Sequence, residues 1–370
     1  MTSGLVALHD GTDSMQISEA QVPEATPGSV VLRVRAAGVC GSDLYYYGVR
    51  TEPESYPGGH EVAAEVIAVG QGVDSLSVGD RVTPEMVGLV RACMKCWFCR
   101  SGNYVKCERQ VPRPGGGFAQ HMKAPAHACF KFPDTMTWQE GAMIEPLAVS
   151  LHGVRRAAVQ AYETAVVLGS GTIGLMAVAA LRAMGTRRII ATARHSHQAR
   201  MAERLGAEIV VQAEDEQPWL DAAGMAHDRM SDSAIPSAGS PLWDTIANLT
   251  EGRGADVVFE CVGGTSGGSL NQAIAISRKG GRVVSVGAPK VLVPVNVIIM
   301  LRRELSLILS HCYSVIDGRH DYEVAIDMIA SGSAPVAELV THTYPLADIN
   351  KAFECAQSKE SGSLKVQVLP

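Results

Sequence analysis

Four cysteines lie within fifteen residues, in the spacing Cys93-x2-Cys96-x2-Cys99-x7-Cys107. Thiolates two residues apart can face one ion from a tight turn, and a fourth thiolate after a short loop completes a tetrahedral shell. Disulfides or free thiols are the alternatives, but disulfides between such close neighbours are strained. We therefore predict a structural zinc that organises a lobe at about residues 90–110 and leaves no coordination position open for chemistry.

The composition is that of an ordinary globular chain without a membrane or nucleic-acid signature. The 370 residues suffice for two domains, and the net charge of −6 gives no electrostatic case for binding nucleic acid or anionic lipid. The N-terminus lacks the basic start and apolar run of a signal peptide, and no apolar stretch is long enough to span a bilayer. The five remaining cysteines are scattered, which suits a reducing compartment, so we expect a cytoplasmic protein. They are Cys40, Cys129, Cys261, Cys312 and Cys355.

The first 150 or so residues have the pattern of a barrel-like β lobe. Ser29–Ala36 and Glu61–Val69 are β-branched or apolar runs, and glycine- or proline-rich turns such as 70–72 and 112–117 separate such segments. Many short strands with frequent turn residues predict a barrel or sandwich.

From Glu163 onward, apolar strands alternate with helical patterns, which predicts an α/β fold with a parallel sheet and right-handed crossovers. The stretch Gln212–Pro241 interrupts the alternation and is predicted to be a surface insertion. The predicted strands are Ala165–Leu168, Arg188–Ala193, Glu208–Val211, Asp256–Cys261, Arg282–Val286, Glu304–Leu309 and Leu364–Leu369, and the predicted helices are Leu175–Met184, Gln198–Leu205, Ser269–Ser277, Tyr322–Ala330 and Ile349–Gln357.

A glycine motif stands between the first of these strands and its helix. Gly169-x-Gly171-x-x-Gly174, with Thr172 and Ile173 between the last two glycines, follows the strand directly and opens the helix. The glycines permit the turn, close approach to a pyrophosphate and tight helix–sheet packing, with the phosphates at the helix N-terminus. A purely structural glycine turn is the alternative. The strand–turn–helix context favours dinucleotide binding.

The end of the second strand indicates which dinucleotide is bound. An NAD site would carry a carboxylate there for the ribose hydroxyls, but Ala193 and Arg194 occupy the place and residues 189–201 contain no carboxylate. A small residue followed by arginine leaves room for a 2′-phosphate and offers it a bidentate partner. A solvated, basic helix start is the alternative. We predict NADP(H) in preference to NAD(H).

A second candidate metal site is spread over the β lobe. Cys40 and the pair His60-Glu61 stand beside glycines, and a cysteine, histidine and carboxylate together can hold a zinc with one open position. Each residue alone also has a simpler interpretation. Cys40 can be a small buried hydrophobic residue, His60 a hydrogen-bonded turn residue, and Glu61 a solvated charge. Glu145 lies in an apolar stretch, where it needs a metal, water or arginine partner, or acts as a helix cap.

Taken together, these segments resemble the zinc-dependent medium-chain dehydrogenase/reductase family, and most of all its sorbitol (polyol) dehydrogenase branch. The resemblance covers nearly the whole chain. It is carried by Gly38–Asp43, Gly59–Glu61, Val78–Val82, the four-cysteine lobe, Ile144–Val149, the glycine motif and Gly254–Glu260.

The resemblance implies a GroES-like β-barrel catalytic domain over residues 1–152, a Rossmann domain over 153–292, and a segment 293–370 that ends the Rossmann sheet and returns to the first domain. The active site is expected in the cleft between the domains. By motif position, Cys40 and His60 are the expected ligands of the catalytic zinc. Glu61 and Glu145 compete to be its third ligand or to hold its water, and Ser42 relays the alcohol proton. Val262, Val286, Gly287 and Ala288 are expected to contact the cofactor.

The implied reaction is zinc-assisted hydride transfer between NADP(H) and a secondary alcohol or ketone, such as a polyol, sugar-like or cyclic alcohol. The resemblance also implies two zinc ions per chain and a homodimer or homotetramer. From the charge and the lack of a long apolar stretch we expect no nucleic-acid or membrane partner. A nucleotide-binding member that has lost turnover is the main alternative. A zinc-free enoyl reductase would leave Cys40 and His60 unexplained.

The sequence departs from that branch at three places. Tyr45 stands where the outer proton-relay histidine is usual, and Cys312 replaces an arginine that precedes a tyrosine near the substrate. The insertion at 212–241 is longer than usual. These changes preserve the expected reaction class but make simple sorbitol a doubtful substrate.

Overall fold

The computed structural model describes residues 3–12, 14–215, 219, 240–358 and 360–370. The chain forms two compact units, one made of Met1–Ala148 with Cys312–Pro370 and the other of Val149–His311. The C-terminal segment therefore belongs to the same unit as the N-terminal part of the chain. Most of the predicted insertion at 212–241 lies outside the described residues, and its structure stays a prediction.

The first unit is built on a seven-stranded sheet with the order β16-β17-β3-β4-β5-β7, in which β6 pairs with β3. Strand β3 contacts β17, β4 and β6, so its β-branched residues are almost all buried. Separately, β1 and β2 form an antiparallel hairpin, as do β14 and β15. The strands are β1 (Ser3–His9), β2 (Met15–Gln21), β3 (Ser29–Gly38), β4 (Glu61–Val69), β5 (Arg81–Pro84), β6 (His121–Pro125), β7 (Cys129–Lys131), β14 (Val315–Ile316), β15 (Arg319–His320), β16 (Val340–Pro345) and β17 (Lys365–Leu369).

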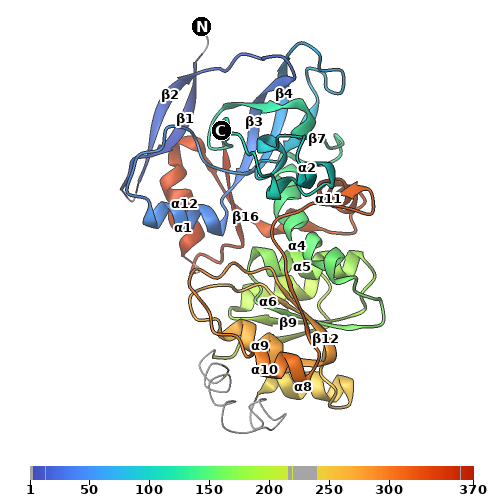
Figure 1. Cartoon of the computed structure of the whole chain (residues 1–370). Helices are drawn as coiled ribbons and strands as arrows, with labels where there is room; N and C mark the ends of the chain where they lie inside the picture. The colour runs from blue at the N-terminus through green and yellow to red at the C-terminus, as the bar shows by residue number, and fades with distance from the viewer. Residues whose placement is uncertain (1–2, 13, 216–218, 220–239, 359) are drawn as a thin grey trace. The chain divides into compact units, whose positions relative to one another are not determined.

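Helices α3 and α12 pack on this sheet, and α1 and α12 lie side by side (Figure 1). The Tyr47 ring of α1 packs on the Phe353 ring of α12 with centroids 4.8 Å apart. This packing anchors α1, whose N-terminus follows Cys40 directly. The helices are α1 (Gly41–Val49), α2 (Trp97–Arg100), α3 (Trp138–Gly141), α11 (Asp321–Ala330) and α12 (Ile349–Gln357), with α4 (Ile144–Ala157) continuing into the residues of the second unit.

The second unit is a six-stranded parallel sheet with the order β10-β9-β8-β11-β12-β13. Helices α5 and α6 cover one face, and α8, α9 and α10 pack on the other (Figure 1). The strand order reverses between β8 and β11, and ligands of such sheets bind at the carboxyl ends of the strands at that point. The elements are β8 (Thr164–Leu168), α5 (Thr172–Ala183), β9 (Arg188–Ala193), α6 (Ser196–Arg204), β10 (Ile209–Gln212), α8 (Pro241–Thr250), β11 (Ala255–Glu260), α9 (Gly268–Ile276), β12 (Ser277–Ser285), α10 (Val297–Arg302) and β13 (Ser306–Leu309).

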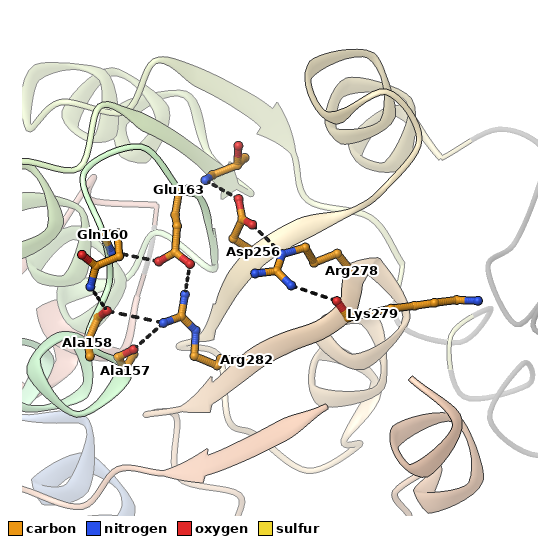
Figure 2. Close-up of polar contacts among 9 residues, drawn as sticks. Ala157, Ala158, Gln160, Glu163, Asp256, Arg278, Lys279 and Arg282 are labelled. Carbon is orange, nitrogen blue, oxygen red and sulfur yellow. Dashed lines mark hydrogen bonds and ion pairs between the residues drawn. The ribbon is translucent and has the colours of Figure 1, made fainter. Parts of the chain in front are cut away.

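Two arginine–carboxylate pairs tie together the opposite, amino-terminal ends of these strands (Figure 2). Arg282 of β12 pairs with Glu163, which directly precedes β8. Asp256 of β11 accepts hydrogen bonds from the Thr164 amide at 2.8 Å and from Arg278 Nε at 2.5 Å. These ion pairs connect the amino-terminal ends of β8, β11 and β12. They do not occupy the carboxyl ends, where ligands of such sheets bind.

The predicted fold class is confirmed: a β-rich GroES-like unit and a doubly wound parallel-sheet unit are both present. Among the helices that the structure describes, none combines the length and the hydrophobicity that a bilayer crossing requires.

Candidate functional site

The structure brings three of the predicted metal ligands together in the first unit. One ligand atom each from Cys40, His60 and Glu61 lie within 4.8 Å of one another. Cys40 follows the end of β3, and Glu61 opens β4, which runs antiparallel to β3 with Gly38 opposite Glu61. One residue that follows the end of β3 and two at the start of β4 therefore meet where these two strand ends lie side by side.

Glycines make room for this cluster. A Cβ at Gly38 would lie 1.9 Å from Glu61 Oε2, so only glycine leaves space for the carboxylate. Gly59, immediately before His60, has φ +85°, and a Cβ there would also press on the Phe118 ring at 3.0 Å. Gly38 thus leaves room for the Glu61 carboxylate, and Gly59 permits the backbone conformation that presents His60.

Asp43 positions two of the three ligands. Its Oδ2 accepts a hydrogen bond from the Cys40 amide at 2.9 Å, and its Oδ1 lies 3.5 Å from His60 Nδ1. Burial alone would lower the pKa of His60, but the charges of Asp43 and Cys40 outweigh burial and raise it well above its usual value. The same negative field favours a metal cation, and the contact at Nδ1 leaves Nε2 for the metal.

Lys365 holds Glu61. Its ammonium donates to Glu61 Oε1 and Oε2, both at 2.7 Å, and to the Val39 carbonyl at 3.1 Å. Lysine and glutamate are 3% and 1% exposed, so this is a buried ion pair. Burial would lower the pKa of Lys365, but the Glu61 charge raises it. The carboxylate is therefore shared between the metal-ligand cluster and a fixed cation.

Glu145 is not part of the three-residue cluster in the described chain. It lies buried in the first turn of α4. Burial raises its pKa to about 7, and the Glu61 charge contributes to the rise, whereas the charges of His60 and Lys365 lower the pKa. It therefore interacts with the cluster electrostatically. Which of Glu61 and Glu145 completes the coordination stays a prediction.

The two positions that depart from the branch lie in different surroundings. Tyr45 and Ser42 are both exposed on α1. Cys312 is partly buried with φ +55°, and burial raises the pKa of its thiol to about 12, with Glu145 adding to the rise. The residue that stands in place of the arginine is thus an uncharged group in the electrostatic neighbourhood of Glu145.

The four-cysteine lobe has the geometry of a closed metal site. The Sγ atoms of Cys93, Cys96, Cys99 and Cys107 all lie within 4.8 Å of one another, with Cys96 and Cys99 3.5 Å apart and Cys93 and Cys99 4.0 Å apart. A tetrahedron with Zn–S bonds of 2.3 Å has edges of about 3.8 Å. Backbone amides point at the sulfurs, including Cys96 N to Cys93 Sγ at 3.3 Å. The donor sets thus fit zinc at both places: four thiolates here, and sulfur, nitrogen and oxygen at the first cluster.

In the second unit, the glycine motif forms the turn that a pyrophosphate requires. Gly169 follows β8 with φ +90°, and Gly171 caps α5 with open space around its Cβ position. A Cβ at Gly174 would lie 1.7 Å from the Gly169 carbonyl oxygen, so the helix can approach the strand this closely only with glycine there. Thr172 and Ile173 form the first turn of α5, whose amides face the carboxyl edge of the sheet.

The other predicted cofactor residues meet the motif at the ends of β8, β11 and β12. Val262 lies against Gly169, because a Cβ there would be 2.7 Å from Val262 Cγ2. Gly263 approaches Ala288, and Gly287 approaches Gly263, so closely that a Cβ on either would clash. Two loops, one after β11 and one after β12, therefore lie in contact, and they contain the predicted residues Val262, Val286, Gly287 and Ala288.

Glu260 fixes this loop pair. Its buried Oε1 accepts hydrogen bonds from the amides of Val262 and Gly263, both at 2.8 Å, and from Ser269 Oγ at 2.9 Å. Its carbonyl accepts from the amides of Val286 and Gly287 at 2.9 Å. One residue at the end of β11 thus holds both loops.

At the end of β9, Ala193 is buried and Arg194 is exposed. The Arg194 carbonyl accepts a hydrogen bond from Gln212 Nε2 at 3.3 Å, which fixes the backbone and leaves the guanidinium to solvent. The arrangement fits the space and the cation that a 2′-phosphate requires.

Three positioning residues were missed in the sequence: Asp43, Lys365 and Glu260. Asp43 and Glu260 lie in the segments Gly38–Asp43 and Gly254–Glu260 that carry the family resemblance, but neither segment indicates their positioning role. Lys365 could have been noticed, because it is a lone cation at the start of a mostly apolar strand. Its partner Glu61 could not have been predicted, because it lies 304 positions away in the sequence.

Two family models match the chain. One, described as the alcohol dehydrogenase GroES-like domain, covers residues 26–134, and the other, described as zinc-binding dehydrogenase, covers residues 172–331. The first lies in the first unit, and the second starts at α5.

Curated relatives match over almost the whole length. Sorbitol dehydrogenase of Bacillus subtilis (strain 168) is 31% identical over 98% of this chain and 96% of its own, and L-idonate 5-dehydrogenase of Vitis vinifera is 29% identical over 96% and 92%. Among solved structures, a zinc-binding dehydrogenase of Sinorhizobium meliloti 1021 bound to NADP superposes with a TM-score of 0.81, at 25% identity and complete coverage of both chains.

Proposed function

The chain belongs to the zinc-dependent medium-chain dehydrogenase/reductase family of alcohol oxidoreductases, in its sorbitol dehydrogenase-like branch, and we propose that it transfers a hydride between NADP(H) and a secondary alcohol or ketone. The observation that carries this proposal is that Cys40, His60 and Glu61 lie close together where β3 ends and β4 begins. A sulfur, a nitrogen and an oxygen are enough protein ligands for a zinc that keeps a position for substrate.

In this proposal Cys40 and His60 hold the catalytic zinc, with Glu61 or Glu145 as the third group. Zinc bound there supplies Lewis-acid polarisation of the substrate oxygen. Asp43 keeps the His60 ring oriented, and Lys365 limits how far the Glu61 carboxylate can move. Ser42 is the proposed acceptor of the alcohol proton, and its exposure on α1 gives that proton access to solvent.

The second proposed zinc lies between Cys93, Cys96, Cys99 and Cys107 and has a structural role. Because these four thiolates fill a tetrahedral shell, no position remains for substrate. None of the nine cysteines forms a disulfide, which fits the cytoplasmic location predicted from the sequence.

NADP(H) is the proposed cofactor, with its pyrophosphate at Gly169–Gly174. The small Ala193 and the exposed Arg194 support the choice, since they offer space and charge to a 2′-phosphate. The S. meliloti structure, which contains NADP, is consistent with it.

The proposed substrates are polyols, sugar-like alcohols or cyclic secondary alcohols. The two relatives named above are named for a sugar alcohol and a sugar acid, both of which carry neighbouring hydroxyls. Cys312, as an uncharged group, removes one contact expected for sorbitol itself.

A homo-oligomer is also proposed, through the free edge of β13 and the neighbouring α10. Among the described residues β13 is the last strand of its sheet, and its Leu309 is 65% exposed. Leu301 on α10 is 76% exposed, and Val297 and Leu292 close by are also exposed. An unpaired edge with apolar neighbours can pair with the same edge of a second copy.

Steady-state kinetics with a panel of polyols and ketones, run with both cofactors, test the function. We expect turnover with NADP(H), and Arg194→Ala to raise the KM for NADP(H) by about tenfold or more while that for NAD(H) changes less than about twofold. Arg187→Ala is a matched control, because Arg187 is also exposed but precedes the opposite end of β9.

If Arg194→Ala raised the KM for NADP(H) and for NAD(H) equally, the cofactor assignment would be contradicted. Tight NADPH binding without turnover of any substrate would contradict the enzymatic proposal and favour a member that has lost catalysis.

A further inference from the structure

A pocket of about 300 Å³ lies in the first unit, bordered by α1, the start of the chain and the loop before β6. Its walls include three arginines, Arg50, Arg91 and Arg113, and three tyrosines, Tyr46, Tyr47 and Tyr56. Its volume is at the lower end of that of small-molecule sites, so it suits a compact ligand.

The acidic residues of this pocket are already committed. Glu54 Oε1 pairs with Arg50 at 3.0 Å. Asp43, the other carboxylate in the wall, accepts from the Cys40 amide and faces His60. Neither carboxylate is therefore available to neutralise the two remaining arginines.

Among the residues that the structure describes, no carboxylate pairs with the guanidinium group of Arg91 or of Arg113. Arg91 Nε donates to the Val111 carbonyl at 3.2 Å, and this neutral contact leaves its charge uncompensated. Arg113 is half-buried and makes no hydrogen bond or ion pair with any residue that the structure describes. Two unpaired cations at one pocket are notable in a chain with a net charge of −6. Such a pair is suited to an oxyanion, which guanidinium binds in a bidentate way.

The aromatic residues indicate what the anion is attached to. Tyr46 and Tyr56 line the pocket and are 57% and 46% exposed, so part of each amphipathic side chain is accessible to a ligand. Such amphipathic rings suit a ligand that alternates C–H and hydroxyl groups, and a purely apolar ligand would leave the arginines unpaired.

We propose that this pocket binds the carboxylate or phosphate of a hydroxylated carbon chain, and that the substrate class is therefore anionic: a sugar acid or a polyol phosphate. The inference rests on the proposed function. Asp43 links the two sites, because the same carboxylate that lines the pocket orients His60. The anion would be bound by Arg91 and Arg113, and neutral polyols would lack that contact.

The test compares D-gluconate and sorbitol 6-phosphate with sorbitol, as kcat/KM with NADP⁺ on the zinc-loaded protein. We expect at least one anionic substrate to be preferred, and Arg113→Gln or Arg91→Gln to lower the ratio of anionic to neutral kcat/KM by about tenfold, mainly through KM. Arg113→Lys, which keeps the charge, should recover most of the ratio. The exposed Arg253 of the second unit supplies the matched control, Arg253→Gln. The preferred anion identifies carboxylate or phosphate as the natural group.

Calorimetric titration of the same protein with sorbitol 6-phosphate and D-gluconate separates the two proposals. This inference would be overturned if the protein oxidised sorbitol with no preference for either anion, and if both glutamine variants left the ratio of anionic to neutral kcat/KM unchanged. The proposed function would then still stand. Anion binding that weakens in Arg113→Gln, in a protein that oxidises no alcohol, would overturn the proposed function while supporting the pocket's ligand. Binding of the anions without any preference in turnover would overturn their assignment as substrates.

Discussion

At the scale of single residues, the Glu61–Lys365 pair shows how the site depends on buried charge. Both groups are almost completely buried, and Lys365 gives Glu61 two contacts of 2.7 Å. A buried ion pair contributes little net stability, but removing one partner leaves a charge in a medium that solvates it poorly.

We therefore predict that Lys365→Met destabilises the protein by about 3–5 kcal/mol, because the Glu61 carboxylate loses its partner. The thermal midpoint, measured by calorimetry, should fall by roughly 10 °C. Adding Glu61→Gln should restore much of the loss. Lys351→Met is the matched control, since Lys351 pairs with Asp348 at the surface and should leave the midpoint unchanged. A double variant as unstable as Lys365→Met alone would contradict this account.

The same residues mark how far the sequence could predict the site. Cys40, His60 and Glu61 were predictable because glycines flank them and cysteine, histidine and carboxylate have few other reasons to occur together. Glu145 was grouped with them, but the structure gives it only an electrostatic relation to the three-residue cluster. Lys365 was not predictable, since the pairing of β17 with β3 brings it near Glu61, and no local pattern encodes that register.

At the scale of elements, hydrophobic periodicity located regular segments well. The bounds of β4, β9 and α12 agree with the prediction. The prediction for β12 was wrong at its start. Arg278–Gly281 has the composition of a turn, yet β12 begins at Ser277, directly after α9, with an irregular register against β11. Helix α5 starts at Thr172, three residues earlier than predicted, because Gly171 is its cap.

The edge strand β13 supports a prediction at this scale. We expect Leu309→Lys or Leu301→Lys to shift the protein toward monomer in sedimentation velocity or light scattering, because each places a charge in the proposed apolar contact. Val78→Lys is a suitable control, since Val78 is 66% exposed in the other unit. An unchanged mass in both leucine variants would exclude this edge as the interface.

At the scale of the whole molecule, the chain divides the proposed reaction between its two units. The first holds both candidate zinc sites, and the second holds the nucleotide motif. The C-terminal segment returns to the first unit and supplies Lys365. The order of motifs allowed both units to be predicted from the sequence. The pocket proposed to bind an anion was not predicted, because its arginines come from three separate segments.

The proposed function requires that Cys40 and His60 hold a zinc on which turnover depends, separate from the zinc of the four-cysteine lobe. The most direct measurement is the zinc content per chain, by mass spectrometry of the metal, together with NADP-dependent alcohol oxidation, in the wild type and in Cys40→Ser. We predict about two zinc ions per wild-type chain. The variant should keep about one and its far-ultraviolet circular dichroism spectrum, but lose turnover. A Cys40→Ser protein that retains both ions, or that still oxidises the alcohol at the wild-type rate, would contradict the claim.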